Sequence, residues 1–224
     1  MFNTKPLILA LAIASPFFAV NAQAAEAKPS VVIVHGAFAD GSDWAKVVPL
    51  LQDKGIKVTV VQNPLTSLAD DVAATNRALN HQDGPAILVG HSWGGTVITE
   101  AGIHPKVAGL VYVSALSPDK GETTSQQYDG FTSPPEFVLD ISEDGYGYVA
   151  PDSFQSGFAH DVSDADAAFM RDAQVPINME VFGTVLEHAA YFQHHTHAIS
   201  GAVFYKKMEE KAFVMQRDIA REKE

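Results

Sequence analysis

A hydroxyl side chain lies between two glycines in the segment Gly90-His91-Ser92-Trp93-Gly94, which follows an apolar run and precedes a helical pattern. This spacing is typical of a serine nucleophile on a sharp turn from strand to helix, where side chains two residues to either side of the serine would collide. Such a turn lifts the hydroxyl of Ser92 above the edge of a sheet, near the positive end of a helix. The chemistry that it predicts is acyl transfer through a covalent intermediate on Ser92.

A serine nucleophile of this kind needs two hydrogen-bond donors for the oxygen of the tetrahedral intermediate. We expect one donor to be the backbone N–H of Trp93, which directly follows Ser92. We expect the other to be the backbone N–H of Ala37, in the loop that follows the first strand. Phe38 and His91 adjoin this site, and we expect both to contact the substrate.

The elements that must position these residues alternate between β-branched runs and amphipathic segments. The predicted strands are 30–34, 57–61, 86–89 and 107–113, and the predicted helices are 43–54, 68–79 and 96–103. Strands that alternate with helices indicate βαβ units, and therefore an α/β fold with a mostly parallel sheet. The candidate nucleophile and the candidate donor loop then both lie at the carboxyl ends of strands.

Residues 117–185 break this alternation. They contain two proline clusters, many aromatic residues and one plausible helix at 161–172. Aromatic side chains at this density need a surface to pack against. We interpret the stretch as a cap, inserted in the main domain (25–224), that covers the carboxyl edge of the sheet.

Three segments together resemble a particular branch of the α/β-hydrolase superfamily. They are Val-His-Gly-Ala-Phe at 34–38, Gly-His-Ser-Trp-Gly-Gly at 90–95 and Ser-Ala-Leu-Ser-Pro-Asp at 114–119. The set is similar to bacterial relatives of plant methyl esterases (salicylate type) and hydroxynitrile lyases. The resemblance implies an α/β-hydrolase fold and cofactor-free hydrolysis of small esters beneath a cap. It also implies Ser92 as nucleophile and Ala37 and Trp93 as oxyanion donors, while a lyase using the same serine stays open.

The same family places its acid and its histidine base after the cap, each following a strand. Two strand–loop–helix units need roughly 50 residues, whereas only 34 residues (191–224) follow Ala190. They contain one possible strand at 197–204, one charged helix at 205–224, and neither a strand-Asp nor a Gly-x-His signature. We therefore expect the sheet to lack its last strands, and the tail 191–224 to be a replaced or out-of-frame end.

Substitutes for the missing base can be considered. His197 is the candidate, in a cluster with His194 and His195 that could equally be an exposed junction or an opportunistic metal site. We expect His35 to be a buried residue that holds its loop by hydrogen bonds, and Asp119 to belong to an ordinary loop. The alternative to a serine esterase is a non-catalytic protein that keeps the pocket and binds a small molecule.

The N-terminus predicts export. Lys5 precedes an apolar stretch from 6 to 20, and Ala22-Gln23-Ala24 has the small-x-small pattern of a cleavage site. Residues 1–24 therefore read as a secretory signal peptide, with a periplasmic or secreted product. An uncleaved membrane anchor is the alternative, although the run is short for a bilayer span.

The overall composition narrows the partners. The formal net charge is −12, with 15 Lys and Arg and no basic stripe, which argues against nucleic acid and anionic membrane. The absence of cysteine excludes disulfides, thiolate metal sites and a cysteine nucleophile. We expect a small-molecule ester as the partner, with no cofactor and no metal, and the sequence does not indicate the oligomeric state.

Overall fold

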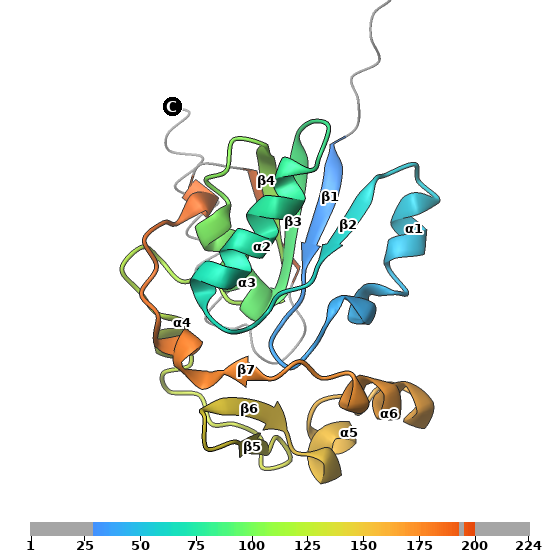
Figure 1. The fold of residues 1–224 in the computed structure, drawn as a ribbon, viewed down its shortest axis with the longest axis vertical. Helices are drawn as coiled ribbons and strands as arrows, with labels where there is room; N and C mark the ends of the chain where they lie inside the picture. The colour runs from blue at the N-terminus through green and yellow to red at the C-terminus, as the bar shows by residue number, and fades with distance from the viewer. Residues whose placement is uncertain (1–28, 193–194, 200–224) are drawn as a thin grey trace, which may run out of the picture.

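The computed structural model describes residues 29–192 and 195–199 and contains a parallel sheet with the strand order β2-β1-β3-β4-β8. The strands are β1 (Ser30–Val34), β2 (Val58–Val61), β3 (Ala86–Ser92), β4 (Val107–Ala115) and β8 (His195–Ile199). Helices α2 (Leu68–Asn80) and α3 (Trp93–Ala101) lie side by side against this sheet, and α1 (Val48–Gln52) lies beyond β2 (Figure 1). The predicted α/β fold with a parallel sheet is confirmed.

The buried strands follow from their apolar sequences. In β1, Val32 and Val34 face one side of the sheet and Ile33 faces the other. All three are almost wholly buried, as expected for a strand covered on both sides. Ser67 caps the N-terminus of α2, because its side chain accepts a hydrogen bond from the backbone N–H of Asp70. Side chains at helical spacing then bury one stripe of α2 against the core.

Two predicted helices have different bounds. The helix predicted at 43–54 is a 3₁₀ turn (Gly41–Trp44) followed by α1. Pro49 lies in the first turn of α1, because proline has no N–H for an earlier carbonyl and cannot continue a helix from before it. The helix predicted at 96–103 is α3, which begins at Trp93, so that β3 runs directly into it at Ser92.

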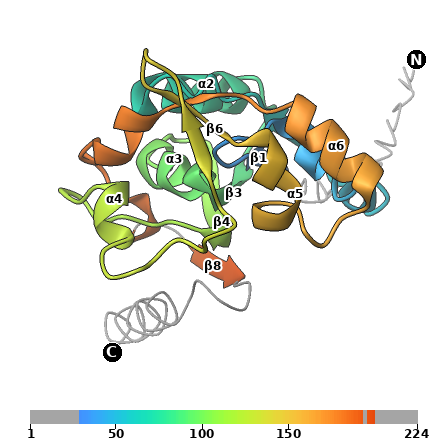
Figure 2. The same cartoon turned by 90° about the horizontal axis from the view of Figure 1, so that it is seen from below.

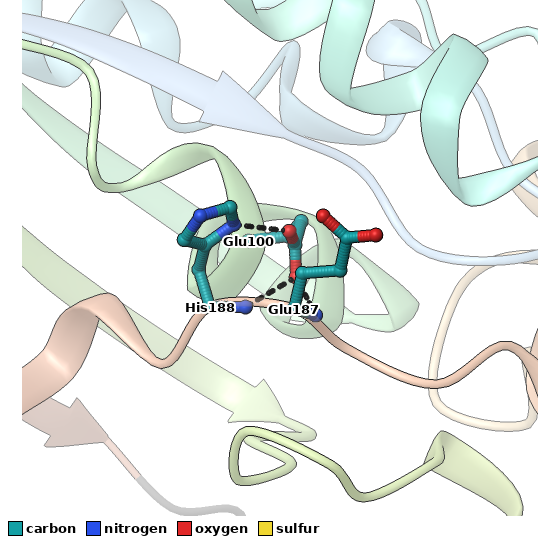
Figure 3. A group of neighbouring side chains, drawn as sticks. All are labelled: Glu100, Glu187 and His188. Atoms are coloured by element: carbon teal, nitrogen blue, oxygen red, sulfur yellow. Dashed lines mark hydrogen bonds and ion pairs between the residues drawn. The ribbon is translucent and has the colours of Figure 1, made fainter.

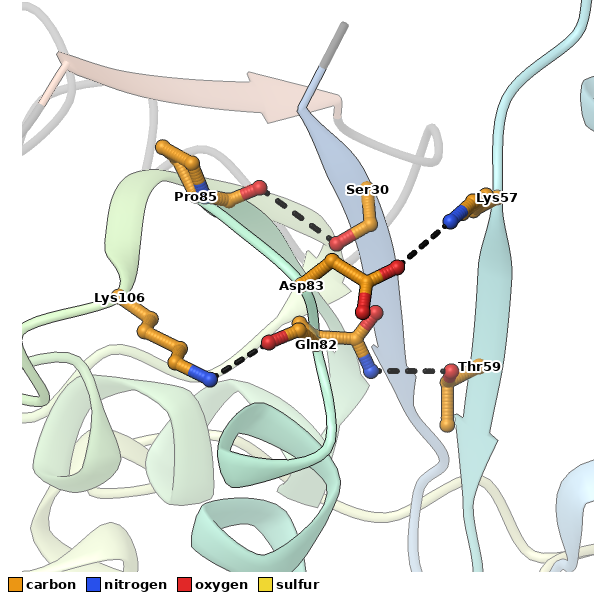
Figure 4. A network of polar contacts seen from close by, with 7 residues as sticks. All are labelled: Ser30, Lys57, Thr59, Gln82, Asp83, Pro85 and Lys106. Carbon is orange, nitrogen blue, oxygen red and sulfur yellow. Dashed lines mark hydrogen bonds and ion pairs between the residues drawn. The ribbon is translucent and has the colours of Figure 1, made fainter. Parts of the chain in front are cut away.

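A polar network fastens the amino ends of the strands (Figure 4). Lys57 pairs with Asp83 at 2.7 Å, and the side chain of Gln82 donates to Thr59 at 3.2 Å. Lys106, which precedes β4, donates to the backbone oxygen of Gln82 at 2.5 Å. The turn between α2 and β3 is thus tied to strands on both sides, at the end of the sheet away from Ser92.

Residues 116–186, which follow β4, form a separate layer at the carboxyl edge of the sheet (Figures 1 and 2). It contains α4 (Thr124–Gln127), α5 (Phe154–Gly157), α6 (Asp164–Asp172) and an antiparallel sheet of β5 (Leu139–Ile141), β6 (Tyr146–Val149) and β7 (Ile177–Asn178). It also contains short 3₁₀ helices at Pro151–Ser153 and Met179–Gly183, whereas a further one at Ala190–Phe192 follows the layer and packs against α3.

The two connections of this layer run side by side. The N–H of Gly121 donates to the oxygen of Leu186, and the N–H of Leu186 donates to the oxygen of Glu122, both at 2.9 Å. The chain therefore leaves the main sheet and returns to it at one place. We call this layer the cap.

Three predicted features fall outside the described residues. These are the signal peptide at 1–24, the charged helix at 205–224 and residues 200–204 of the last predicted strand. No helix in the described ranges is both long enough and apolar enough to cross a bilayer.

Candidate active site

Ser92 occupies a strained turn between β3 and α3. Its φ is 50° and its ψ is −121°, a conformation that a residue with a Cβ rarely adopts. A Cβ added to Gly90 would lie 2.5 Å from the backbone oxygen of Gly94, so the predicted collision across the turn is confirmed. The two glycines therefore permit the turn, and Ser92 immediately precedes the first residue of α3.

The loop after β1 lies against this turn. A Cβ on Gly36 would come within 3.1 Å of the Cβ of Ser92, and one on Gly94 would come within 2.3 Å of the oxygen of Val34. The structure thus brings the loop that carries Ala37 directly beside Ser92 and Trp93, the three residues predicted to form the nucleophile and its oxyanion donors. Both Ala37 and Trp93 are buried.

His35 holds this loop, as predicted. It is 1% exposed; its Nδ1 lies 2.9 Å from the oxygen of Gly36, and the backbone N–H of Asn63 donates to its Nε2 at 2.9 Å. A carbonyl can only accept and an amide N–H can only donate, so these partners specify the neutral ring with its proton on Nδ1. Burial lowers the pKa of His35, which favours the same neutral form.

Of the residues predicted to contact substrate, Phe38 belongs to this loop and His91 lies at the end of β3 against it. His91 is half-buried, and its Nδ1 donates to the oxygen of Val113 at 2.8 Å. Phe38 has a φ of 61° and packs edge-on against Phe137 and Phe158 of the cap, with ring centroids 6.1 and 6.3 Å apart. The cap therefore places aromatic rings over the candidate donor loop.

A buried carboxylate beside the turn was not predicted from the sequence. Asp71 of α2 is 0% exposed, and its two oxygens accept hydrogen bonds from the indole N–H of Trp93 and the backbone N–H of Leu65, each at 2.8 Å. Burial raises the pKa of Asp71 to about 6, although both hydrogen bonds oppose this shift. The available signal was an aspartate at helical spacing between apolar residues Leu68 and Leu79.

The structure does not bring His197 to Ser92. His197 is exposed and pairs with Val111, which pairs in turn with Val89, three residues before Ser92. The separation is therefore about 10 Å along the strands and about 10 Å across them. Among residues 29–192 and 195–199, no hydrogen bond joins a histidine to the hydroxyl of Ser92.

None of the remaining sequence candidates has a described contact with this hydroxyl. The backbone N–H of Asp119 donates to a carboxylate oxygen of Glu122 at 2.9 Å, within the connection to the cap. His194 lies outside the described residues, as does the side chain of His195. Only one strand, β8, follows the cap in the part of the chain that the structure describes.

One group in the described ranges has the composition of a metal site (Figure 3). Ligand atoms of Glu100, Glu187 and His188 lie within 4.8 Å of one another. However, Glu100 of α3 already accepts from the backbone N–H groups of Glu187 and His188, at 3.0 and 3.1 Å, and from the Nδ1 of His188 at 2.6 Å. The group fastens the segment after the cap to α3, which accounts for its geometry without an ion.

A cavity of about 540 Å³ lies where the cap meets the start of α2. Its lining includes Thr66, Asn178 and Glu180, and none of the residues predicted for the active site. The cavity and the candidate nucleophile are therefore separate features of the cap interface.

The amino-acid sequence matches a known protein family and two known relatives. The model of the alpha/beta hydrolase family matches residues 31–205. The chain is 26% identical over 152 residues to a probable hydrolase, R7, of Phoma sp., covering 61% of each chain. It is 35% identical over 106 residues to the pyrethroid hydrolase of Sphingobium wenxiniae, covering 42% of this chain and 38% of that protein. The chain thus spans less than two thirds of the length of both curated relatives.

Solved structures with a similar fold cover more of the chain. A variant of polyneuridine aldehyde esterase has a TM-score of 0.67 at 18% identity, covering 83% of this chain and 86% of that one. An extracellular α/β-hydrolase from a Paenibacillus species, with structural and functional homology to tobacco salicylic acid binding protein 2, has a TM-score of 0.63 at 20% identity. That match covers 79% of this chain and 82% of the other. At these identities the likeness concerns the fold.

Proposed function

Because this chain belongs to the α/β hydrolase family, we propose that it hydrolyses small carboxylic esters through an acyl-enzyme on Ser92. The observation that carries the proposal is the backbone of Ser92, at φ 50° and ψ −121° on the junction of β3 and α3. A residue with a Cβ keeps such a conformation only where its surroundings impose it, and conformations of this kind cluster at active sites. The esterase and pyrethroid hydrolase among the related proteins support an ester as the substrate class.

The proposed reaction begins when Oγ of Ser92 attacks the carbonyl carbon of the ester. The carbonyl oxygen becomes an oxyanion, for which the backbone N–H groups of Trp93 and Ala37 are the proposed donors. The C–O bond to the alcohol then breaks, and the alcohol leaves with the proton that Ser92 gave up. Water then adds to the acyl-serine, which releases the acid and returns a proton to Oγ of Ser92. The aromatic rings of Phe38, Phe137 and Phe158 favour a small apolar group on the ester.

A fluorophosphonate probe tests the proposal without assuming a substrate. We expect the wild-type chain to be labelled and to hydrolyse p-nitrophenyl acetate, and we expect Ser92→Ala to lose both activities. Ser156→Ala is the matched control, because Ser156 is an exposed serine of α5. Equal labelling of the wild type and Ser92→Ala would refute the nucleophile.

A second candidate is a non-catalytic protein that binds a small molecule beside Ser92 without hydrolysing it. The position of His197 favours it, because steps of about 10 Å along the strands and about 10 Å across them place this residue about 14 Å from Ser92. Removal of the base from a serine hydrolase typically lowers kcat by a factor of roughly 10⁴ to 10⁶. Binding of an ester analogue by calorimetry, with no labelling of Ser92, would support this candidate over the first.

We also propose that the protein is exported, on the strength of the N-terminal sequence. Lys5, the apolar stretch and Ala22-Gln23-Ala24 support cleavage after Ala24. N-terminal sequencing of the mature protein from a periplasmic or culture fraction should begin at Ala25. A product that begins at Met1 in the cytoplasm would contradict the proposal.

A further inference from the structure

The carboxylate of Asp71 lies where three parts of the molecule meet. It belongs to α2, it accepts from the indole of Trp93 at the start of α3, and it accepts from Leu65 in the loop between β2 and α2. It is wholly buried and has no cationic partner among these contacts. A buried carboxylate is costly, so its contact with the residue that follows the candidate nucleophile needs a physical reason.

We propose that Asp71 is a positioning residue that holds Trp93 so that its backbone N–H points at the developing oxyanion. This inference rests on the proposed function, since the backbone N–H of Trp93 is a proposed oxyanion donor. The indole of Trp93 is fixed at two points, by the hydrogen bond to Asp71 and by an edge-on contact with the ring of Phe182, whose centroid lies 5.4 Å away. A side chain fixed at both points leaves little freedom for its own backbone amide.

The second oxygen of Asp71 extends this support to the cap. Leu65 has a left-handed φ of 57°, and its N–H donates to Asp71. Its own oxygen accepts from the backbone N–H of Asn178 in β7 at 2.9 Å, and the side chain of Asn178 donates to Thr66 at 3.3 Å. One carboxylate therefore joins the candidate oxyanion donor to the loop on which the cap rests.

The ionised aspartate suits this place better than other residues of its size. The two N–H groups that face it each require an acceptor, and each carboxylate oxygen supplies one. Asparagine has a single acceptor oxygen, so its NH₂ group would face one of the two donors. Leucine would leave both donors unpaired. Burial of the charge is unfavourable. We infer that the hydrogen bonds from Trp93 and Leu65 are what offset this cost.

Asp71→Asn is the variant that tests the proposal. We expect kcat for p-nitrophenyl acetate to fall about tenfold or more with KM within about twofold, because a misdirected donor affects the transition state more than the bound ester. Thr75→Val is the matched control, since it removes a buried hydrogen bond of 3.0 Å to the backbone oxygen of Asp71 and leaves the carboxylate intact. A similar loss of kcat in both variants would overturn the assignment.

A double-mutant cycle with Trp93→Phe separates positioning from general damage. This variant removes the indole N–H and keeps the backbone N–H, so Asp71→Asn should have a clearly smaller effect on kcat when Trp93 is already Phe. Independent, additive effects would overturn the proposal. If Asp71→Asn does not fold, Trp93→Phe alone should lower kcat with KM little changed, and an unchanged kcat would then overturn it.

If the wild type shows no turnover and no labelling, the proposed esterase function fails. The positioning role of Asp71 can then still be tested by nuclear magnetic resonance. In Asp71→Asn, both the indole N–H and the backbone N–H of Trp93 should change in chemical shift and exchange faster with solvent, and in Thr75→Val neither should. An unchanged backbone N–H of Trp93 in folded Asp71→Asn would overturn the positioning role.

Discussion

The turn at Ser92 and the segment after the cap are constrained to very different degrees. The turn is flanked by the wholly buried Trp93, by a loop that leaves no space for a Cβ on Gly94, and by the carboxylate of Asp71. The segment after the cap is fastened through Glu100 and ends, among the described residues, in the five residues of β8, which pair with β4. The residues of the candidate nucleophile half of the site therefore lie together, whereas no histidine in the described ranges forms a hydrogen bond with the hydroxyl of Ser92.

The comparison shows that the two halves depend on different kinds of information. The turn depends on glycines close together in the chain, because a Cβ on Gly90 would meet the backbone of Gly94, and on the single loop after β1 that packs against it. A base must reach Ser92 from a distant strand, so its place depends on the number and register of all the strands before it. Variants that remove one constraint at a time can break or sharpen this contrast.

The largest effect is expected for Gly94→Ala. A Cβ at this position would lie 2.3 Å from the oxygen of Val34 and 2.8 Å from that of His35, both of which are backbone atoms that cannot move alone. We expect the free energy of unfolding to fall by about 3 kcal/mol or more, measured by urea denaturation. Gly84→Ala is the control, because no atom lies within 4 Å of its added Cβ, and it should change stability by about 0.5 kcal/mol or less. Similar losses in both would mean that the turn is less constrained than its contacts indicate.

The second largest effect is expected from Asp71, which makes the free energy of unfolding depend on pH. Its pKa is raised to about 6 from 3.8, so the native state binds this proton more tightly than the unfolded state. The contribution to stability is therefore fully present below pH 3.8 and is lost as pH rises through 6. Between pH 7.5 and pH 4.5 the wild type should gain about 2 kcal/mol relative to Asp71→Asn, from unfolding curves at both values.

This comparison cancels the opposite contribution of His35, which both proteins contain. Burial lowers the pKa of His35, so its contribution is present above pH 6.5 and is lost as pH falls through the native pKa. An equal pH dependence in the wild type and Asp71→Asn would contradict the raised pKa of Asp71.

The sequence predicted the parts of the site that depend on short-range sterics. The glycines around Ser92, the loop of Ala37 and the hydrogen-bonding role of His35 follow from motifs of a few residues, and the structure places them together. Asp71 was missed because periodicity marks it as one buried position among several and does not reveal its contact with Trp93, which lies 22 residues along the chain. The helix at 43–54 was overextended because its apolar spacing was given more weight than Pro49.

A smaller effect should come from releasing the strain at Ser92. At φ 50° and ψ −121°, glycine has no Cβ to oppose the conformation, although it loses more backbone entropy on folding. Ser92→Gly should therefore be more stable than Ser92→Ala by about 1 kcal/mol, from the midpoints of thermal or urea unfolding. Both variants lack the hydroxyl, so the difference isolates the backbone. A more stable alanine variant would show that the surroundings do not hold this residue under strain.

The smallest effect is expected for His197→Ala, and it bears on the contrast most directly. His197 is exposed on β8, level with Val89 rather than with Ser92, so its loss should change stability by about 0.5 kcal/mol or less. The rate of fluorophosphonate labelling should also stay within about twofold of wild type, because a side chain this far away cannot accept the proton of Ser92. Thr196→Ala, on the neighbouring residue of β8, controls for disturbance of the strand.

A large loss of labelling in His197→Ala alone would make His197 the base after all. The chain would then have to bring β8 to the turn in a conformation other than this one, and the contrast between the two regions would describe a resting state rather than an incomplete site.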